Sequence, residues 1–229
     1  MAPLRRPRHW KRWLIAGVVV VLLVVVGGPF VYFHFIEGPA PAPFKLSKPK
    51  QAAAAAPLGG TWTVASGSQA GYRVSENLFG QSHTAVGRTT AVTGQLVATS
   101  TQVTNTSVTV QMTKVTSDSG ERDNQFQGRI MDTADFPTAT FTLTSPISLG
   151  TVPAAGSTVS ETASGTLQLH GTTRSVRVPI TAVQDGTTIQ VKGSIPVTFS
   201  DYNIDNPSGG PASVGDSGTV EFLLTFRKA

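Results

Sequence analysis

The chain has 229 residues, a formal net charge of +5 and no cysteine. The lack of cysteine excludes disulfides, thiolate metal sites, cysteine nucleophiles and a lipid-modified cysteine, so stability has to come from burial. The charge is unevenly placed: five basic residues precede Leu14, whereas residues 61–229 hold 10 basic and 12 acidic residues. A domain without a basic excess gives no reason to expect a nucleic-acid partner, and we predict none.

The N-terminus carries the features of a membrane anchor. Residues 1–13 form a basic tail, and residues 14–33 run for twenty positions without a charge, which is about the length that spans a bilayer as a helix. We predict a transmembrane helix over residues 14–36 in a single-pass protein of the cell membrane, with the N-terminus cytoplasmic and the C-terminal domain extracytoplasmic. The alternative is a signal peptide whose apolar region ends at residues 27–29 and which is cleaved after Ala40.

Two further regions follow the predicted anchor. Residues 37–60 are rich in proline and alanine and have no repeating apolar face, which predicts an extended linker. From residue 61 onward, short runs alternate apolar with polar residues, as half-buried β-strands do. Residues 61–229 are therefore predicted to form one β domain, and a chain of this length can bury a sizeable core without disulfides.

About eight strands are predicted in this domain. Threonine and valine dominate them, as suits a pleated surface that is buried on one side. The hairpin at residues 165–180 is the clearest, because its five aliphatic residues fall on one face, and its turn is predicted at residues 171–173. The alternating runs lie at residues 62–64, 72–74, 95–99, 108–112, 139–143, 167–169, 176–180, 189–199 and 220–226.

One stretch breaks the alternation. In residues 121–131, Phe126 and Ile130 are one helical turn apart, which predicts a short helix that ends before Asp135. A helix between two strands is suited to cap one end of a barrel or a sandwich. An eight-stranded closed barrel is wide enough to hold one small ligand.

Two sets of polar residues have a simpler interpretation than a catalytic or metal site. Gly215-Asp216-Ser217-Gly218 matches the motif around the nucleophile of chymotrypsin-like serine proteases. Neither His83 nor His170 lies in a recognisable context for the base, so we predict a turn at this motif. The two histidines also lack the spacing of metal ligands, so no metal site is predicted. We therefore expect a protein that is not an enzyme and needs no cofactor.

The aromatic residues of the domain leave one question open. Alternation is the same whether these side chains fill a solid core or line a long apolar cavity. The residues concerned are Trp62, Tyr72, Phe126, Phe141, Phe199, Phe222 and Phe226.

Four sequence landmarks, taken in order, resemble the YceI-like domain family. They extend over residues 61–228, nearly the whole of the C-terminal part. Between the first and the second landmark, residues 76–87 depart from the family's pattern, and no element is predicted there. The landmarks are Gly60-Thr61-Trp62-Thr63-Val64; Glu121-Arg122-Asp123 followed by Asp135-Phe136-Pro137-Thr138-Ala139-Thr140-Phe141; Gly165-Thr166-Leu167-Gln168-Leu169-His170-Gly171-Thr172-Thr173; and Ser200-Asp201-Tyr202-Asn203-Ile204.

The resemblance implies an all-β fold, an extended eight-stranded antiparallel lipocalin-like β-barrel with a short helix, here preceded by the N-terminal transmembrane helix. It also implies an exported bacterial protein without catalysis, whose apolar channel holds a polyisoprenoid or another long-chain amphiphile. The lipid's polar head group is expected to meet Arg122, Asp123 and Tyr202. Its tail is expected to contact the inward residues Phe141, Leu143, Leu167, Leu169, Val197, Phe199, Phe222 and Leu224.

On this basis we expect a membrane-anchored extracytoplasmic protein that holds a polyisoprenoid, a quinone-like molecule or another long-chain lipid, for carriage or storage. The expected partners are the lipid and the membrane, and a homodimer is left open. One competing hypothesis is a cell-surface interaction or scaffold β domain with a solid core and no ligand. Another is a hydrolase built on Ser217.

Overall fold

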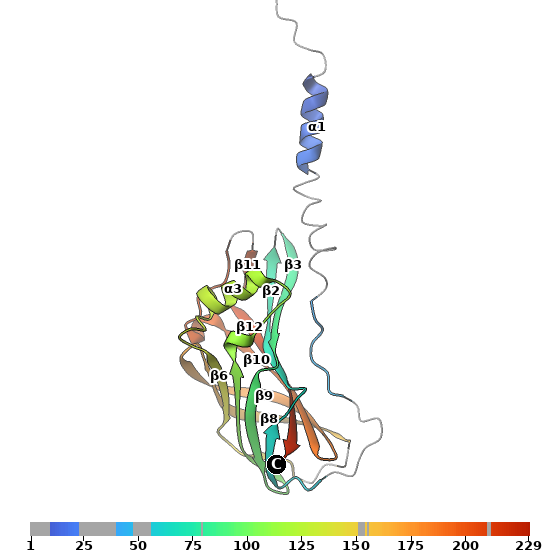
Figure 1. Cartoon of the computed structure of the whole chain (residues 1–229), viewed down its shortest axis with the longest axis vertical. Coiled ribbons are helices and arrows are strands. Elements are labelled where there is room, and N and C mark those ends of the chain that lie inside the picture. Colours follow the sequence, from blue (N-terminus) through green and yellow to red (C-terminus); the bar gives the residue numbers. More distant parts are fainter. Residues whose placement is uncertain are drawn as a thin grey trace, which may run out of the picture. The chain divides into compact units, whose positions relative to one another are not determined.

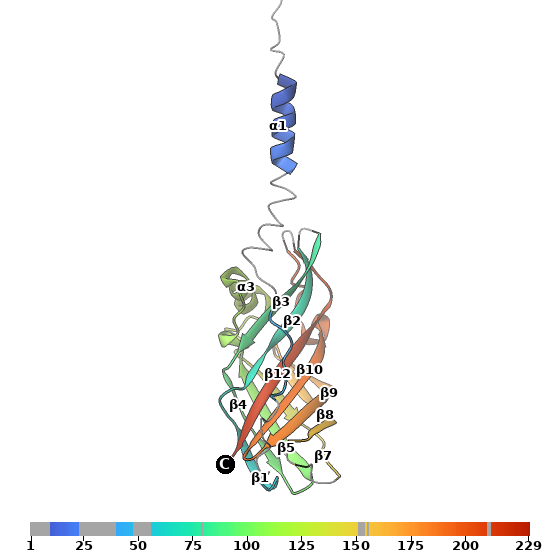
Figure 2. The same cartoon turned by 90° about the vertical axis from the view of Figure 1, so that its right-hand side faces the viewer.

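The computed structural model divides the chain into two compact units, Met1–Ala40 and Pro41–Ala229. Figures 1 and 2 show the helices and strands of these units from two directions. The described residues are 10–22, 40–47, 56–78, 80–150, 154, 156–209 and 212–229.

The first unit contains helix α1 (Trp10–Leu22), whose side chains are exposed. This helix covers the start of the transmembrane helix predicted over residues 14–36, and residues 23–36 lie outside the described part of the chain. Within the residues that the structure describes, no helix is both long enough and apolar enough to cross a membrane. The membrane anchor and the extracytoplasmic location therefore stay predictions.

The described part of the second unit contains twelve strands in one sheet. They are β1 (Gly60–Val64), β2 (Gln69–Leu78), β3 (Gln81–Thr89), β4 (Val92–Ala98), β5 (Gln102–Gln111), β6 (Thr138–Leu143), β7 (Ile147–Ser148), β8 (Thr158–Leu169), β9 (Thr172–Asp185), β10 (Thr188–Thr198), β11 (Ala212–Val214) and β12 (Ser217–Lys228). The short helical segments between them are η3 (Met112–Lys114), α3 (Gly120–Gln125), η4 (Phe126–Ile130) and η5 (Phe199–Tyr202).

Eight of these strands close into an antiparallel barrel. They follow the order β1, β4, β5, β6, β8, β9, β10 and β12, and β12 pairs back with β1 to complete the ring. One edge of β12 pairs with two strands in succession, because Phe226 lies opposite Val64 of β1 and Val220 lies opposite Tyr72 of β2. The β2–β3 hairpin thereby continues the wall beyond β1, as Figure 2 shows. The predicted eight-stranded antiparallel barrel is confirmed.

The β8–β9 hairpin shows how sequence alternation builds the wall. His170 and Gly171 have positive φ angles of 49° and 71°, and they form the two-residue turn that matches the twist of paired strands. The turn predicted at residues 171–173 is placed slightly too late, because Thr172 already pairs with Leu169. Leu169 and Val178 are buried in the core, as the alternation predicts.

Three strands, β3, β7 and β11, lie outside the sequence predictions. β3 occupies most of residues 76–87, where no element is predicted from the sequence. Its residues on the inner face are His83, Ala85 and Gly87. Because one of them is polar and two are small, the sequence of β3 shows no alternation of large apolar with polar residues. β7 and β11 have two and three residues, which is too short to show a period.

The helix predicted over residues 121–131 is confirmed as α3, which η4 continues as a π-helical turn. Ser119 caps α3, because its hydroxyl accepts a hydrogen bond from the backbone N–H of Arg122 at 3.3 Å. Phe126, the first residue of η4, is buried in the core. Figure 1 shows α3 at the end of the barrel where β2, β3 and β11 lie, with the C-terminus at the opposite end.

The end of the barrel near the C-terminus has a solid core. Trp62 of β1 and Phe226 of β12 are among the largest fully buried side chains, at 0% and 1% exposure. The indole N–H of Trp62 donates to the backbone oxygen of Leu58 at 2.7 Å, so the polar atom of this buried ring is satisfied. These two aromatic side chains fill the barrel where β1 meets the last residues of β12.

Residues 41–47, within the predicted linker, pack on the outer wall of the barrel. The backbone oxygen of Pro41 accepts from Arg73 Nη2 at 2.7 Å, and that of Ala42 accepts from Arg88 Nη2 at 2.6 Å. The Arg88 guanidinium also lies 4.0 Å from the centre of the Phe44 ring. Both arginines bind Glu221, whose side chain is only 7% exposed. We call residues 41–47 the strap, because they cover this buried ion cluster.

Candidate functional site

The residues predicted to contact a lipid tail come together in the apolar interior. Phe141 and Phe222 are partly exposed and pack against the buried cluster that contains the other six. Those six buried residues are Leu143, Leu167, Leu169, Val197, Phe199 and Leu224. The structure therefore places all eight in one region, and their contact with a lipid stays a prediction.

Phe222 and Phe141 each cover a glycine of the neighbouring strand. Gly193 of β10 lies directly opposite Phe222, and a Cβ atom added to it would be 2.5 Å from Phe222 Cζ. A Cβ atom added to Gly165 of β8 would likewise be 2.5 Å from Phe141 Cζ. Since no side-chain atom fits in those spaces, each ring occupies the place of the missing side chain. The two rings are thereby held against the wall of the barrel.

The exposure of inward side chains changes along β12. Phe226 is 1% exposed and Leu224 is 7% exposed, whereas Phe222 and Val220 are only partly buried. A closed wall shields its inner face from bulk solvent, so the exposed surface of these two side chains faces the interior or the mouth of the barrel. Along β12, the inward side chains are therefore fully buried near the C-terminus and only partly buried at Val220 and Phe222.

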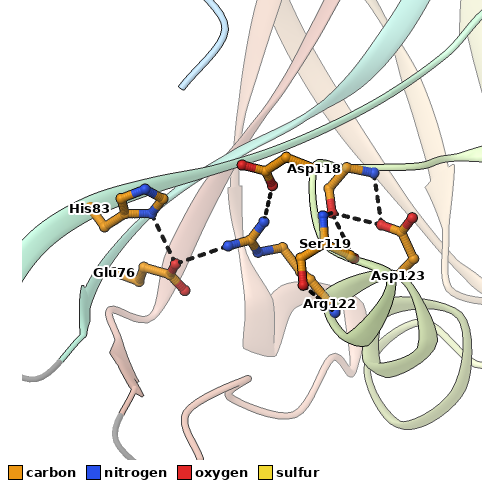
Figure 3. A network of polar contacts seen from close by, with 7 residues as sticks. Glu76, His83, Asp118, Ser119, Arg122 and Asp123 are labelled. Carbon is orange, nitrogen blue, oxygen red and sulfur yellow. Dashed lines mark hydrogen bonds and ion pairs between the residues drawn. The ribbon is translucent and has the colours of Figure 1, made fainter. Parts of the chain in front are cut away.

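A polar network joins the β2–β3 hairpin to α3 (Figure 3). Glu76 Oε1 is 3.2 Å from His83 Nδ1 and 3.6 Å from Arg122 Nη2. Arg122 Nη1 also pairs with the carboxylate of Asp118. The side chains of Glu76 and Arg122 are 12% and 16% exposed, so these charges are largely removed from water. Arg122 therefore forms ion pairs with two carboxylates.

Asp123 faces the loop before α3 and not Arg122 (Figure 3). Its Oδ1 accepts from the backbone N–H and from the hydroxyl of Ser117, both at 2.7 Å. These bonds fix the loop whose Ser119 caps the helix. The contact of Asp123 with a lipid head group, expected from the sequence, stays a prediction.

Tyr72 lies beside the network, on the inner face of β2. Its ring stacks on Phe126 with a centroid distance of 4.9 Å, and it covers Gly87 of β3. Burial raises the pKa of Tyr72 to about 12, with the Arg122 charge acting against this and nearby carboxylates acting with it. Tyr72 therefore keeps its phenolic proton through the whole neutral range.

Tyr202, the third residue expected to meet a head group, lies in η5 and is 3% exposed. Its backbone oxygen contacts His170 Nδ1 at 3.1 Å, and the neighbouring Asp201 oxygen accepts from Arg174 Nε at 2.8 Å. Burial raises the pKa of Tyr202 as well. Its contact with a lipid stays a prediction.

The network contains two residues that the sequence analysis does not assign to a site, Glu76 and His83. Alternation from Tyr72 through Val74 places Glu76 on the inner face, which is a signal that the sequence does contain. His83 could be assigned only from the register of β2 and β3, in which it lies opposite Glu76. In that register Leu78 pairs with Gln81, and the sequence gives no strong turn motif between these two residues.

Of the serine motif, Gly215 and Asp216 precede β12, with a bend at Asp216, and Ser217 and Gly218 are the first residues of this strand. The backbone oxygen of Asp216 accepts from Phe199 N at 2.9 Å, and its carboxylate accepts from Asn206 Nδ2 at 3.1 Å. Ser217 begins β12 and is exposed. Within the described ranges, no group of three or more His, Cys, Asp or Glu residues could hold a metal ion.

Comparison with known proteins agrees with this architecture. The model of the YceI-like domain family matches residues 62–226. A polyisoprenoid-binding domain from Saccharophagus degradans, implicated in plant cell wall breakdown, has a TM-score of 0.59 at 18% identity, over 74% of this chain and 98% of that one. BcnA from Burkholderia cenocepacia has a TM-score of 0.53 at 21% identity, over 69% of this chain and 95% of that one. No curated protein matches the chain.

Proposed function

This chain belongs to the YceI-like domain family, and from that membership we propose that it binds a long-chain isoprenoid or a similar amphiphilic lipid inside its barrel. The protein would carry or store the lipid and would not transform it. The likeness to a polyisoprenoid-binding domain supports this choice of ligand class.

The observation that carries the proposal is the placement of the inward aromatic rings. Phe141 and Phe222 cover glycines of the adjacent strands and remain partly exposed, although both face the inside of a closed barrel. A scaffold domain with a solid core would bury these large rings fully, because their burial contributes most to such a core. Rings held at the wall are suited to contact a thin apolar chain along the barrel axis.

The physical chemistry of a lipid tail fits an apolar interior of this kind. Removing each methylene-sized group from water gains about 0.8 kcal/mol, so a long tail needs apolar surface and few polar contacts. The packed end at Trp62 and Phe226 would stop the tail. The head group would then lie near α3, where the polar network is found.

We further propose that the protein acts outside the cytoplasm and is anchored by residues 14–36. This part of the proposal rests on the uncharged N-terminal run and on the basic residues before it. An anchor would keep the barrel close to a bilayer and so raise the local concentration of membrane lipids around it.

The proposal is tested by a single substitution that places a charged side chain in the apolar interior of the barrel. The full chain is incubated with vesicles that contain a fluorescent long-chain isoprenoid, and the probe retained after removal of the vesicles is measured. Phe141→Arg should abolish retention, because an arginine would place a charge among apolar side chains. Thr142→Arg is the matched control, since Thr142 is exposed on the opposite face of the same strand. Equal retention by both folded variants would refute binding next to Phe141.

A further inference from the structure

We propose that the outer wall of the barrel carries a docking site for an extended, proline-containing peptide, and that the chain's own strap, residues 41–47, is its ligand. The site lies on the face of β2, β3 and β12 that points away from the apolar interior, so the inference does not depend on lipid binding. Docking attaches the N-terminal part of the chain to this wall, in addition to its covalent connection at β1.

The first argument is that the site is built into the wall. Arg88 of β3 and Glu221 of β12 both lie directly opposite Gly71 of β2, one on each side of it. A Cβ atom added to Gly71 would lie 3.0 Å from Arg88 Cγ, so the missing side chain leaves the space in which Arg88 reaches across β2. Arg88 Nη2 is 2.7 Å and Arg73 Nε is 3.2 Å from the Glu221 carboxylate. Glu221 thereby fixes two guanidinium groups side by side.

The second argument is how the backbone of the strap meets these two groups. Arg73 Nη2 donates to the backbone oxygen of Pro41 at 2.7 Å. Arg88 Nη2 donates to the next backbone oxygen, that of Ala42, at 2.6 Å. An extended proline-rich segment has no internal hydrogen bonds, so its carbonyl groups are available to such donors. Proline at positions 41 and 43 also restricts the backbone before docking, which lowers the conformational entropy lost on docking.

The third argument is that the wall also recognises side chains of the strap. The centre of the Phe44 ring lies 4.0 Å from the Arg88 guanidinium, a cation–π contact. Phe44 and Leu46 are partly buried, whereas Lys45 between them is exposed. Lys45 is the only charged residue of the strap and has the same sign as the two arginines. The ligand is therefore selected by its carbonyl groups and its aromatic ring, and not by an opposite charge.

The strap is held at both of its ends. The backbone N–H of Ser47 donates to Gln190 Oε1 of β10 at 2.9 Å, whereas Pro41 and Ala42 bind the arginines of β2 and β3. The backbone of the second unit therefore starts at the wall formed by β2 and β3, and not at Gly60, the first residue of β1. The docking site thus determines where the N-terminal part of the chain is attached to the barrel.

The first test measures docking within the full chain by hydrogen exchange of the Ser47 amide, read by NMR. Exchange should be several-fold slower in the wild type than in Phe44→Ala, which removes the ring from the Arg88 guanidinium. Lys45→Ala is the matched control, because Lys45 is exposed, and it should leave the exchange unchanged. Exchange of Ser47 in the wild type at the rate of an unstructured peptide, or at the same rate as in Phe44→Ala, would overturn the proposal.

The second test supplies the ligand as a separate molecule. In a variant of the full chain, residues 41–47 are replaced by a glycine-serine segment of equal length, which leaves the site open. A fluorescent peptide with the sequence of residues 40–47 should bind this open variant saturably, and a peptide of the same composition in scrambled order should not. The wild type should bind the peptide at least about tenfold more weakly, because its attached strap competes at a high effective concentration.

A substitution in the wall of the open variant tests the role of Arg88. Arg88→Lys should weaken peptide binding several-fold, because lysine keeps the positive charge beside Glu221 but lacks the planar group that lies against the Phe44 ring. Arg177→Lys, at an exposed position of β9, is the matched control and should change nothing.

Three outcomes of the peptide experiment would overturn the docking site. They are no binding to the open variant, equal binding of the ordered and the scrambled peptide, and equal binding by the open variant and the wild type. Neither test reads lipid retention, so the docking site and the proposed function can fail independently of each other.

Discussion

Gly87 lies directly opposite Tyr72 on adjacent strands, and the Tyr72 ring occupies the space that a side chain at position 87 would need. The three atoms nearest to a Cβ built on Gly87 all belong to Tyr72, at 2.3, 2.7 and 3.0 Å. Phe222 likewise lies directly opposite Gly193 and occupies the space of the missing side chain. The ring of Phe141 does so at Gly165, although the residue directly opposite Gly165 is Leu143. Glycines on the inner wall thus determine where the large rings of the barrel lie.

The substitution Gly87→Ala should destabilise the protein by about 1–3 kcal/mol, because the new methyl group overpacks the space under the Tyr72 ring. Urea unfolding followed by circular dichroism measures this change. Gly215→Ala is the matched control, since a Cβ at position 215 would meet nothing within 4 Å. In the background Tyr72→Ala the cost of Gly87→Ala should largely disappear, and equal costs in both backgrounds would show that the ring is not the cause.

The raised pKa of Tyr72 predicts a loss of stability in alkali. Burial raises this pKa from 10.0 to about 12, so between those values the unfolded chain releases the phenolic proton and the folded chain keeps it. The folded state then binds more protons, and stability that is fully present below pH 10 is lost as the pH rises toward 12. Between pH 9.5 and 12 the unfolding free energy of the wild type should fall by about 2 kcal/mol more than that of Tyr72→Phe. Parallel pH profiles for the two proteins would contradict this prediction.

The polar network predicts that Arg122 holds the β2–β3 hairpin to α3. Arg122→Met would leave the carboxylates of Glu76 and Asp118 without their shared cation, at a cost of about 1–3 kcal/mol. Hydrogen exchange read by mass spectrometry should show faster exchange in β2, β3 and α3, with little change in β8 and β9. Arg177→Met, at an exposed position of β9, serves as the control. Unchanged exchange in the hairpin would mean that the network contributes nothing to this contact.

The outer ion cluster predicts a large effect of Glu221→Gln. The side chain of Glu221 is 7% exposed and binds both Arg73 and Arg88, so its neutralisation leaves two cations facing each other under the strap. The unfolding free energy should fall by about 2–3 kcal/mol, and proteases should cut residues 41–47 more readily. Glu121→Gln is the control, because Glu121 is exposed on α3. Equal stability of the two variants would show that the cluster is not coupled to the fold.

Alternation in the sequence predicts the greater part of the barrel, because its inward residues are mostly large and aliphatic. The β8–β9 hairpin and the last strand are examples, since Leu169, Val178 and Phe226 are buried where the period of two places them. The prediction fails in β3, where His83 and Gly87 take inward positions and the wall is completed by the ring of Tyr72. A strand whose inner face is covered by another strand's side chain shows no pattern of its own.

The candidate site also has a part that the sequence predicts and a part that it does not. The eight positions expected to contact a lipid tail are inward positions by alternation, and the structure gathers them in one interior. The polar network does not follow from alternation, because it needs the register that sets Glu76 opposite His83 and the placement of α3 that brings Arg122 to them. Register and helix placement are long-range properties, and short sequence periods do not determine them.

The central claim is that the barrel holds a long-chain lipid, and the most direct measurement is of what the protein carries. The full chain is expressed in a bacterium, purified, and extracted with organic solvent, and the extract is analysed by mass spectrometry beside the Phe141→Arg variant. The account predicts a long-chain isoprenoid or a similar lipid, close to one per protein, which the variant lacks. An extract without such a lipid, together with no uptake of the fluorescent isoprenoid from vesicles, would contradict the account and favour a surface domain with a solid core.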